Sequence, residues 1–214
     1  MKIQMNTATQ FLGITIDQKL TFLDHINSIN KKINSACYLM IQLRNKISFK
    51  ALKSVYYAYI HSTILYGIIL WGNSPHAKQV FVNQKRAIRI LTRKSYRTSC
   101  KDIFKEQNII TLPGLYILEI LKYVKREPEN FPLLGPFPTY QTRFRLNNEK
   151  TVVVEPHATS FYEKSVQYNG TKLFNMLPLG LREMEPKRFA SLIKDYVTTK
   201  SFYSIEEFAE DIKK

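Results

Sequence analysis

Arginines recur at steps of three, four and four residues in the first half of the chain, at Arg86, Arg89, Arg93 and Arg97. A helix that runs to about residue 94 would carry them on one face. A guanidinium group forks two N–H donors onto phosphate oxygens, so such a face could follow a nucleic-acid backbone. The alternative is a solvated helix face with no partner. We predict that the nucleic-acid-binding residues are Lys31, Lys32, Lys85, Arg86, Arg89, Arg93, Lys94 and Arg97.

The distribution of charge supports this interpretation. Lys and Arg number 32 against 17 Asp and Glu, which gives a net charge of +15 at pH 7. From His25 to Lys101 the sequence has fourteen Lys and Arg and no Asp or Glu, whereas the residues after Thr111 are nearly balanced, with 15 basic and 13 acidic. A folded stretch of one sign indicates a polyanionic partner such as a nucleic acid. A basic protein without such a partner is the alternative.

Residue types that could support catalysis or bind a metal lack the necessary spacing. Zinc sites need Cys or His in close pairs, but Cys37 and Cys100 are far apart and the four His are scattered. Two-metal phosphoryl transfer needs several converging carboxylates, and only Asp17 and Asp24 precede the acid-free stretch. We interpret Asp17 as a strand end and Asp24 as a helix cap. We therefore predict no catalytic residue, no metal ligand and no cofactor in this chain.

Length and composition limit the class of protein. With 214 residues, 44% of them hydrophobic, the chain can bury a core as one large domain or two small ones. No apolar run approaches the roughly 20 residues that span a bilayer, and the first residues lack a secretory signal. We expect an intracellular protein, cytoplasmic or nuclear, that is not secreted and has no membrane partner.

Hydrophobic periodicity predicts a mainly α fold, a helical bundle with a short N-terminal β-strand or hairpin and a helical C-terminal extension. The expected elements of the first part are a strand or hairpin within residues 10–17, a helix from about 26 to 47 with a capping box at Thr21 and Asp24, a helix after Ser48, a segment over 64–71 buried on several sides, a helix from Ser74 and Pro75 to about Lys94, a short helix from Ser99 to Phe104, and a helix from Leu112 to Arg126.

Prolines divide the chain, because four of them fall between residues 127 and 150. We predict a β segment over 1–20, a basic helical domain over 21–126, a Pro-rich linker over 127–150 and a helical extension over 151–214. The extension should contain a strand over 151–154 and helices over 161–168, 171–177, 186–199 and 205–213, the last with a capping box at Ser204 and Glu207. The core of the first half should contain Ile29, Ile33, Met40, Val55, Tyr59, Trp71, Ile88 and Leu91.

Several motifs in one order resemble the region downstream of the catalytic core in jockey-like reverse transcriptases of retrotransposons without long terminal repeats. The resemblance covers nearly the whole chain, although Phe22 and Phe174 stand where tryptophan is commoner in that family. The motifs are Phe11-Leu12-Gly13-Ile14-Thr15-Ile16-Asp17, Leu65-Tyr66-Gly67 with Leu70-Trp71-Gly72, Gln84-Lys85-Arg86-Ala87-Ile88-Arg89-Ile90, Gly170-Thr171-Lys172-Leu173-Phe174-Asn175-Met176-Leu177-Pro178, and Phe202-Tyr203-Ser204 with Glu207-Phe208.

This resemblance implies the end of a polymerase palm, a thumb that grips the primer–template duplex, and a C-terminal extension. In that family the catalytic carboxylates form an Asp-Asp pair upstream of the Leu-Gly strand, and this chain has no Asp-Asp pair. The family activity is RNA-directed DNA polymerisation, but the resemblance implies here a non-catalytic fragment that lacks the palm and fingers, with magnesium expected only in the full-length polymerase. The alternative is a co-opted helical protein-interaction module without a nucleic-acid role.

Overall fold

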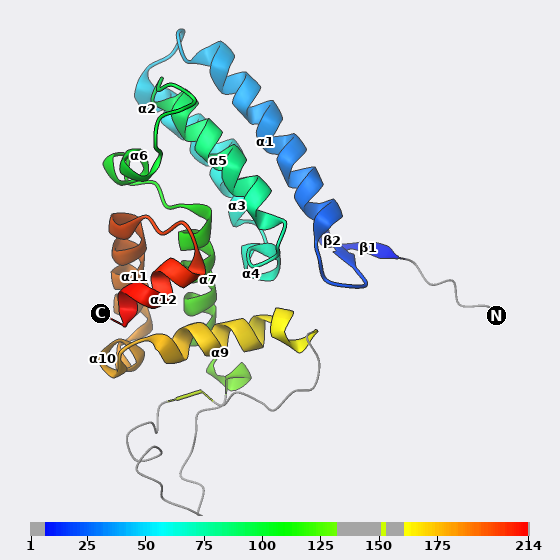
Figure 1. Ribbon diagram of the computed structural model, residues 1–214, viewed down its shortest axis with the longest axis vertical. Helices are drawn as coiled ribbons and strands as arrows, with labels where there is room; N and C mark the ends of the chain where they lie inside the picture. Colours follow the sequence, from blue (N-terminus) through cyan, green and yellow to red (C-terminus); the bar gives the residue numbers. More distant parts are fainter. Residues whose placement is uncertain (1–6, 132–150, 153–160, 214) are drawn as a thin grey trace, which may run out of the picture.

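The computed structural model describes residues 7–131, 151–152 and 161–213, and these residues form a helical protein with one β-hairpin (Figure 1). Strands β1 (Ala8–Phe11) and β2 (Ile14–Asp17) pair antiparallel. The connecting residues Leu12 and Gly13 have φ angles of 46° and 80°, as a tight two-residue hairpin turn requires. The prediction of a mainly α fold with a short N-terminal hairpin is confirmed.

The turn before helix α1 (Leu23–Leu43) is organised by Asp17. Its carboxylate accepts hydrogen bonds from the backbone N–H groups of Thr21 at 3.0 Å and Phe22 at 2.6 Å. Burial would raise the pKa of Asp17, but these hydrogen bonds hold it below its ordinary value. The predicted capping box at Thr21 and Asp24 is wrong, because Phe22 occupies the N-cap without a side-chain cap, whereas Asp17 ends β2 as expected.

Ser48 caps the next helix, α2 (Phe49–Val55), by accepting a hydrogen bond from Ala51 N at 3.2 Å, as the sequence predicts. The helix widens into a π-helix, η1 (Tyr56–His61), and continues as α3 (Ser62–Leu65). These elements pack against α1.

The turn between α3 and α4 (Ile68–Trp71) fixes the hairpin to the helices. Tyr66 donates its hydroxyl hydrogen to the carbonyl oxygen of Leu12. Gly67 has a φ angle of 62°, and a Cβ atom there would lie 2.5 Å from Ile14 Cδ1. Glycine therefore lets β2 pack directly on this turn.

Helix α5 (Ala77–Leu91) lies beside α1 and runs parallel to it, and α7 (Leu112–Arg126) lies between this pair and the C-terminal helices (Figure 1). Ser74 does not cap α5 as predicted, because the helix begins only at Ala77, with His76 at its N-cap. The Ser74 hydroxyl donates to the carbonyl of Thr21 at 2.6 Å and accepts from His76 N at 3.2 Å. Helix α7 has the bounds that the sequence predicts. A short helix α6 (Lys101–Glu106) precedes it, with Cys100 rather than Ser99 at its N-cap, and the 3-10 turn η2 (Pro128–Asn130) follows.

The C-terminal part packs on α7, and its last helices agree with the prediction, including the Ser204 cap, which accepts a hydrogen bond from Glu207 N at 3.1 Å. The predicted division into helices over 161–168 and 171–177 is wrong, since one helix runs through Gly170. A Cβ at Gly170 would lie 2.9 Å from Val124 and 3.0 Å from Phe131, so glycine allows α7 and this helix to approach closely. In the predicted strand, Val152 bonds the Asn175 side chain through its backbone at 2.9 Å, and residues 153–154 lie outside the described residues. The elements are η3 (Tyr162–Lys164), α9 (Val166–Met176), α10 (Leu179–Glu183), α11 (Pro186–Lys200) and α12 (Ile205–Ile212).

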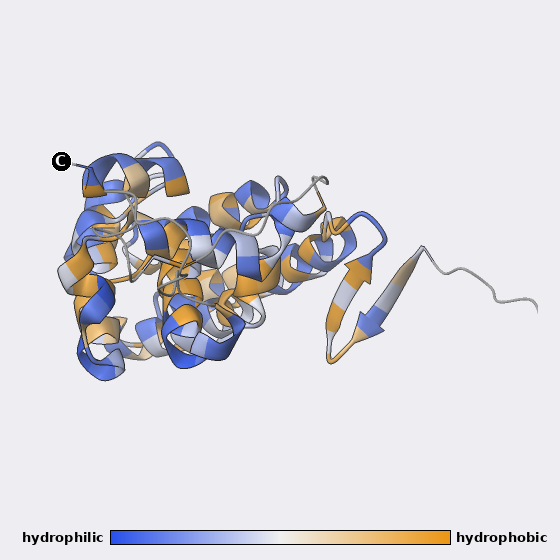
Figure 2. Cartoon of the chain, turned by 90° about the horizontal axis from the view of Figure 1, so that it is seen from below, coloured by the Kyte–Doolittle hydropathy of each residue, from blue (hydrophilic) through white to orange (hydrophobic). Residues whose placement is uncertain are grey.

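One hydrophobic core extends from α1 to α12, and apolar residues face inward on the helices (Figure 2). Two core predictions are not confirmed. Val55 is only half-buried, and Tyr59 is 56% exposed because it lies on the outer side of η1. Tyr66 is also 54% exposed, so the segment over 64–71 is not buried on several sides. The core residues predicted correctly are Ile29, Ile33, Met40, Trp71, Ile88 and Leu91.

Candidate nucleic-acid interface

Helix α5 ends at Leu91, three residues earlier than predicted. Arg93 has a left-handed backbone with φ 56°, its N–H donates to Ile90 O at 3.3 Å, and Lys94 N–H donates to Arg89 O at 3.0 Å. This is a Schellman termination in which arginine occupies the position that usually holds glycine. The predicted face of four arginines on one helix is therefore wrong, because Arg93 and Arg97 lie beyond the helix.

The predicted residues on α5 itself point to different neighbours. Arg86 donates from Nη1 to Asn34 Oδ1 of α1 at 3.2 Å and is exposed. Lys85 Nζ lies 4.7 Å from the ring centroid of Phe81 and 5.5 Å from that of Tyr203, toward the C-terminal part. These two neighbouring side chains thus occupy different sides of the helix.

The remaining predicted residues are also dispersed. Arg89 Nε donates to Thr98 O at 2.9 Å and so anchors the loop after α5, and Arg97 Nε donates to Tyr96 Oη at 2.8 Å. Lys31 and Lys32 are both exposed on α1, and Lys32 lines a pocket beneath the hairpin. Arg93 and Lys94 of the predicted set come together in one concave site.

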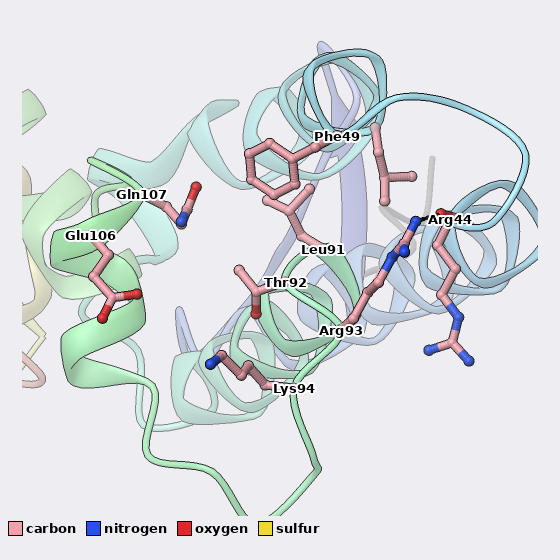
Figure 3. A pocket seen from close by; sticks show the side chains of 9 residues that line it. Arg44, Phe49, Leu91, Thr92, Arg93, Lys94, Glu106 and Gln107 are labelled. Carbon is pink, nitrogen blue, oxygen red and sulfur yellow. Dashed lines mark hydrogen bonds between the residues drawn. The ribbon is translucent and has the colours of Figure 1, made fainter.

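That site is a pocket of about 410 Å³ where the C-terminal ends of α1 and α5 meet (Figure 3). The Arg93 guanidinium donates to the backbone carbonyl of Arg44, and Phe49 and Leu91 form the apolar wall between the helices. Lys94 extends from the end of α5 at the edge of the pocket. The pocket is lined by Arg44, Phe49, Leu52, Leu91, Thr92, Arg93, Lys94, Glu106 and Gln107.

The pocket combines cations with an apolar surface. Arg44, Arg93 and Lys94 supply N–H donors that suit phosphate oxygens, and Phe49 is 46% exposed, so its ring is available to a sugar or a base. Helix C-termini also favour cations, and the bond to Arg44 O holds the Arg93 side chain against the end of α1. Sequence reasoning missed Arg44 and Phe49. The one usable signal is the helix junction predicted at Ser48, which places both residues at one end of the bundle.

The positive charge of this region is not neutralised within the described residues. None of the Lys and Arg from Lys31 to Arg97 forms an ion pair with another residue that the structure describes. Glu106 is the one carboxylate in the pocket lining. The resulting field favours an anionic ligand.

The described residues contain no group of three or more His, Cys, Asp or Glu side chains that could hold a metal ion. Cys37 and Cys100 are buried, and burial raises the pKa of both thiols, so neither favours the reactive thiolate.

Within the described residues, no helix combines the length and the apolar character needed to cross a bilayer.

Comparisons with known proteins find polymerases of mobile elements from Drosophila melanogaster. The RNA-directed DNA polymerase from mobile element jockey is 26% identical over 129 residues, which cover 58% of this chain and 14% of that protein. The probable RNA-directed DNA polymerases from transposon BS and from transposon X-element are 30% and 26% identical over 48% and 40% of this chain, and these segments span 12% and 10% of those proteins. No family model and no solved structure matches. The resemblance to retrotransposon reverse transcriptases is thus confirmed at low identity over part of the chain.

Proposed function

From this relationship to retrotransposon RNA-directed DNA polymerases, we propose that the chain is a non-catalytic C-terminal region of such an enzyme and binds the primer–template duplex. The observation that carries the proposal is the pocket at the end of α5, which Arg44, Arg93 and Lys94 line together with an apolar wall, and none of these three cations forms an ion pair with another described residue. The duplex would be RNA–DNA or DNA, bound through its backbone without reading of sequence.

In this proposal the cations of the pocket meet successive phosphates, and Phe49 packs against a sugar or a base. The other predicted residues, Lys31, Lys32, Lys85, Arg86, Arg89 and Arg97, extend the positive field around the bundle. The described carboxylates form no cluster that fits the magnesium ions of a polymerase, so we derive no catalytic step from this chain. Palm and fingers domains would supply that chemistry.

The test compares two double variants with the same loss of charge. Arg44→Gln with Lys94→Gln alters the pocket, and Arg188→Gln with Lys187→Gln alters exposed residues in the first turn of α11. Duplex binding is measured by fluorescence anisotropy between 50 and 300 mM salt. We expect the pocket variant to lower the log–log salt slope by about 1.8, at roughly 0.9 per phosphate contact for B-DNA, equally for unrelated sequences, and the control to change it little.

A pocket variant that binds with the wild-type affinity and salt slope would contradict the proposal and favour the protein-interaction module. Arg89 is a poor choice for this test, although the sequence suggests it, because its side chain holds the loop through Thr98. Its substitution would mix folding with binding.

A further inference from the structure

The loop after α5, residues 92–100, carries a serine between cations. Arg93 and Lys94 directly precede Ser95, and Arg97 follows it two residues later. All four residues are exposed. Arg93 and Lys94 also line the pocket at the end of α5, so a change at Ser95 occurs next to two residues of the candidate nucleic-acid interface.

The hydroxyl group of Ser95 is accessible, and its hydrogen is not used within the described residues. Its oxygen accepts one long hydrogen bond, 3.5 Å, from Arg97 N. Hydroxyl groups on the neighbouring helical segment differ, because Ser54, Ser62 and Thr63 donate to carbonyl oxygens of the preceding helical turn. An exposed hydroxyl on a loop is a group that a modifying enzyme can reach.

The two threonines of the same loop are less accessible. Thr92 is half-buried and donates its hydroxyl hydrogen to Ile88 O at 2.9 Å. Thr98 is also half-buried, and its carbonyl oxygen accepts the hydrogen bond from Arg89 Nε at 2.9 Å. Both residues therefore help to hold the loop against α5.

Ser99 resembles Ser95 in sequence but differs from it in structure. Each serine is exposed and has a basic residue two positions before it and two positions after it. Cys100 is 2% exposed and occupies the N-cap of α6, and Lys101 is the first residue of that helix. An enzyme that binds an extended segment around Ser99 would have to unwind α6, whereas residues 93–97 contain no helix or strand.

The charges around Ser95 indicate the class of enzyme that could modify it. Kinases select their substrates partly by charge pattern, and three cations within two residues of Ser95 complement an acidic substrate cleft. The first carboxylate after Ser95 in the chain is Asp102. A serine/threonine kinase that prefers basic segments fits this pattern.

We propose that Ser95 is a phosphorylation site and that a phosphate group on it weakens duplex binding. The inference rests on the proposed function, because it assigns a form of regulation to the same pocket. In the reaction the Ser95 hydroxyl oxygen attacks the γ-phosphorus of ATP. The bond from that phosphorus to the bridging oxygen breaks, ADP leaves, and the hydroxyl proton is released.

A phosphate group on Ser95 would compete with the duplex for the same cations. It carries a charge of about −1.5 to −2 at pH 7 and accepts charge-assisted hydrogen bonds from lysine and arginine. Lys94 is exposed and adjacent to Ser95, with Cα atoms about 3.8 Å apart, so its ammonium group can reach the phosphate oxygens. The positive charge of the pocket is then balanced within the chain, and less of it is available to a polyanion.

The test treats the full folded chain with ATP and the catalytic domain of protein kinase C, and mass spectrometry of its peptides locates the phosphate. We expect the phosphate on Ser95 and not on Ser99, although both serines lie between basic residues. Ser95→Ala should abolish the modification, and Ser99→Ala should retain it. Both serines are exposed, so neither substitution should impair folding.

Duplex binding is then measured by fluorescence anisotropy before and after kinase treatment. We expect phosphorylation to lower the log–log salt slope of the wild-type protein by about 1.8, at roughly 0.9 for each of two lost phosphate contacts. Ser95→Ala treated in the same way should keep its slope.

Phosphate on Ser99, or on neither serine, would overturn the inference. A phosphorylated Ser95 with unchanged duplex binding would overturn the regulation and leave the proposed function intact. A protein that binds no duplex before kinase treatment would contradict the proposed function, and the regulation that rests on it would be overturned with it.

Discussion

The two ends of the described chain satisfy their cations in different ways. In the first region, Arg86 bonds an asparagine side chain, and Arg89 and Lys53 bond backbone carbonyls at 2.9 and 2.7 Å. In the last helices, carboxylates take this role: Glu207 pairs with Lys101, and Asp211 pairs with Lys200 at 2.9 Å. Both arrangements provide hydrogen-bond acceptors for the N–H groups.

The difference lies in the charge that remains. A carbonyl or an amide satisfies a donor but leaves the unit positive charge, whereas a carboxylate cancels it. The first region is therefore held together by neutral acceptors and keeps a positive field, and the C-terminal helices are locally balanced. A polyanion would gain binding energy from the first region and little from the second.

The largest expected effect is the loss of a buried neutral side chain in the first region. Gln84 is fully buried on α5, where its Nε2 donates to Tyr56 Oη and Ile110 O, both at 3.0 Å, and its Oε1 accepts from Leu112 N at 2.8 Å. Gln84→Ala leaves these groups unpaired and creates a cavity, so we expect the free energy of unfolding to fall by about 3 kcal/mol. Urea denaturation measures this loss.

The matched control for Gln84 is Gln79→Ala on the same helix. Gln79 is exposed and accepts one long hydrogen bond, 3.5 Å, from Asn30. We expect a change within about 0.5 kcal/mol. Equal losses in the two variants would show that the buried amide is not what joins α5 to α7.

A smaller effect is expected at a carboxylate of the second region. Glu207→Gln removes the ion pair with Lys101 and weakens the bond that Glu207 Oε2 accepts from Tyr203 N at 2.7 Å. Because the pair is partly exposed, we expect a loss of about 0.5–1 kcal/mol in thermal or urea unfolding. Salt screens the ion pair, so this loss of stability should be smaller in 1 M NaCl. The control is Glu210→Gln, an exposed residue on the same helix, which should neither lose stability nor respond to salt.

A substitution at Arg93 should separate stability from binding. Arg93→Gly relieves the left-handed backbone at φ 56° but removes the hydrogen bond to Arg44 O, so we expect a net gain of about 0.5 kcal/mol in unfolding free energy and weaker duplex binding. Arg97→Gly, which has no positive φ to relieve, should not stabilise the protein. A destabilised Arg93→Gly would show that the side-chain contact outweighs the backbone strain.

The smallest effect at pH 7 comes from two histidines, the buried His25 and the half-buried His61. Burial, reinforced by Lys32, lowers the pKa of His25, and burial lowers that of His61, where Lys194 adds to the effect and Glu119 opposes it. Because the pKa of each histidine is lower in the folded protein, the unfolded chain binds protons more readily. The free energy of unfolding should therefore be constant above pH 7 and fall below about pH 6.5, by at most about 1.4 kcal/mol per pH unit for each histidine.

Chemical denaturation between pH 8 and 5 measures this slope. His25→Phe should flatten it, whatever its effect on absolute stability, because phenylalanine takes up no proton. A wild-type slope that the substitution leaves unchanged would assign the acid sensitivity to other groups.

Features that depend on neighbouring residues could be predicted from the sequence only in part, because the caps expected at Thr21, Ser74 and Ser99 do not form. Ser48 and Ser204 cap their helices as expected, and α7 has the predicted bounds, because a cap needs only a side chain and an N–H group three residues away. The end of α5 could not be predicted in this way, since an arginine takes the glycine position and is held there by α1. Gly170 likewise lies between two helices predicted from the sequence, whereas its close packing against α7 depends on the fold.

The same division applies to the candidate site. The sequence by itself determined the sign of the charge, the acid-free stretch and the types of residue that could meet phosphate. Only the tertiary structure decided which of them converge: it separated Lys85 from Arg86, used Arg89 to hold a loop, and joined Arg44 to Arg93. The net charge is a sum over residues and follows from the sequence alone. A binding site depends on where helices end and on which helix faces pack together, and contacts between residues distant in the chain determine these two features.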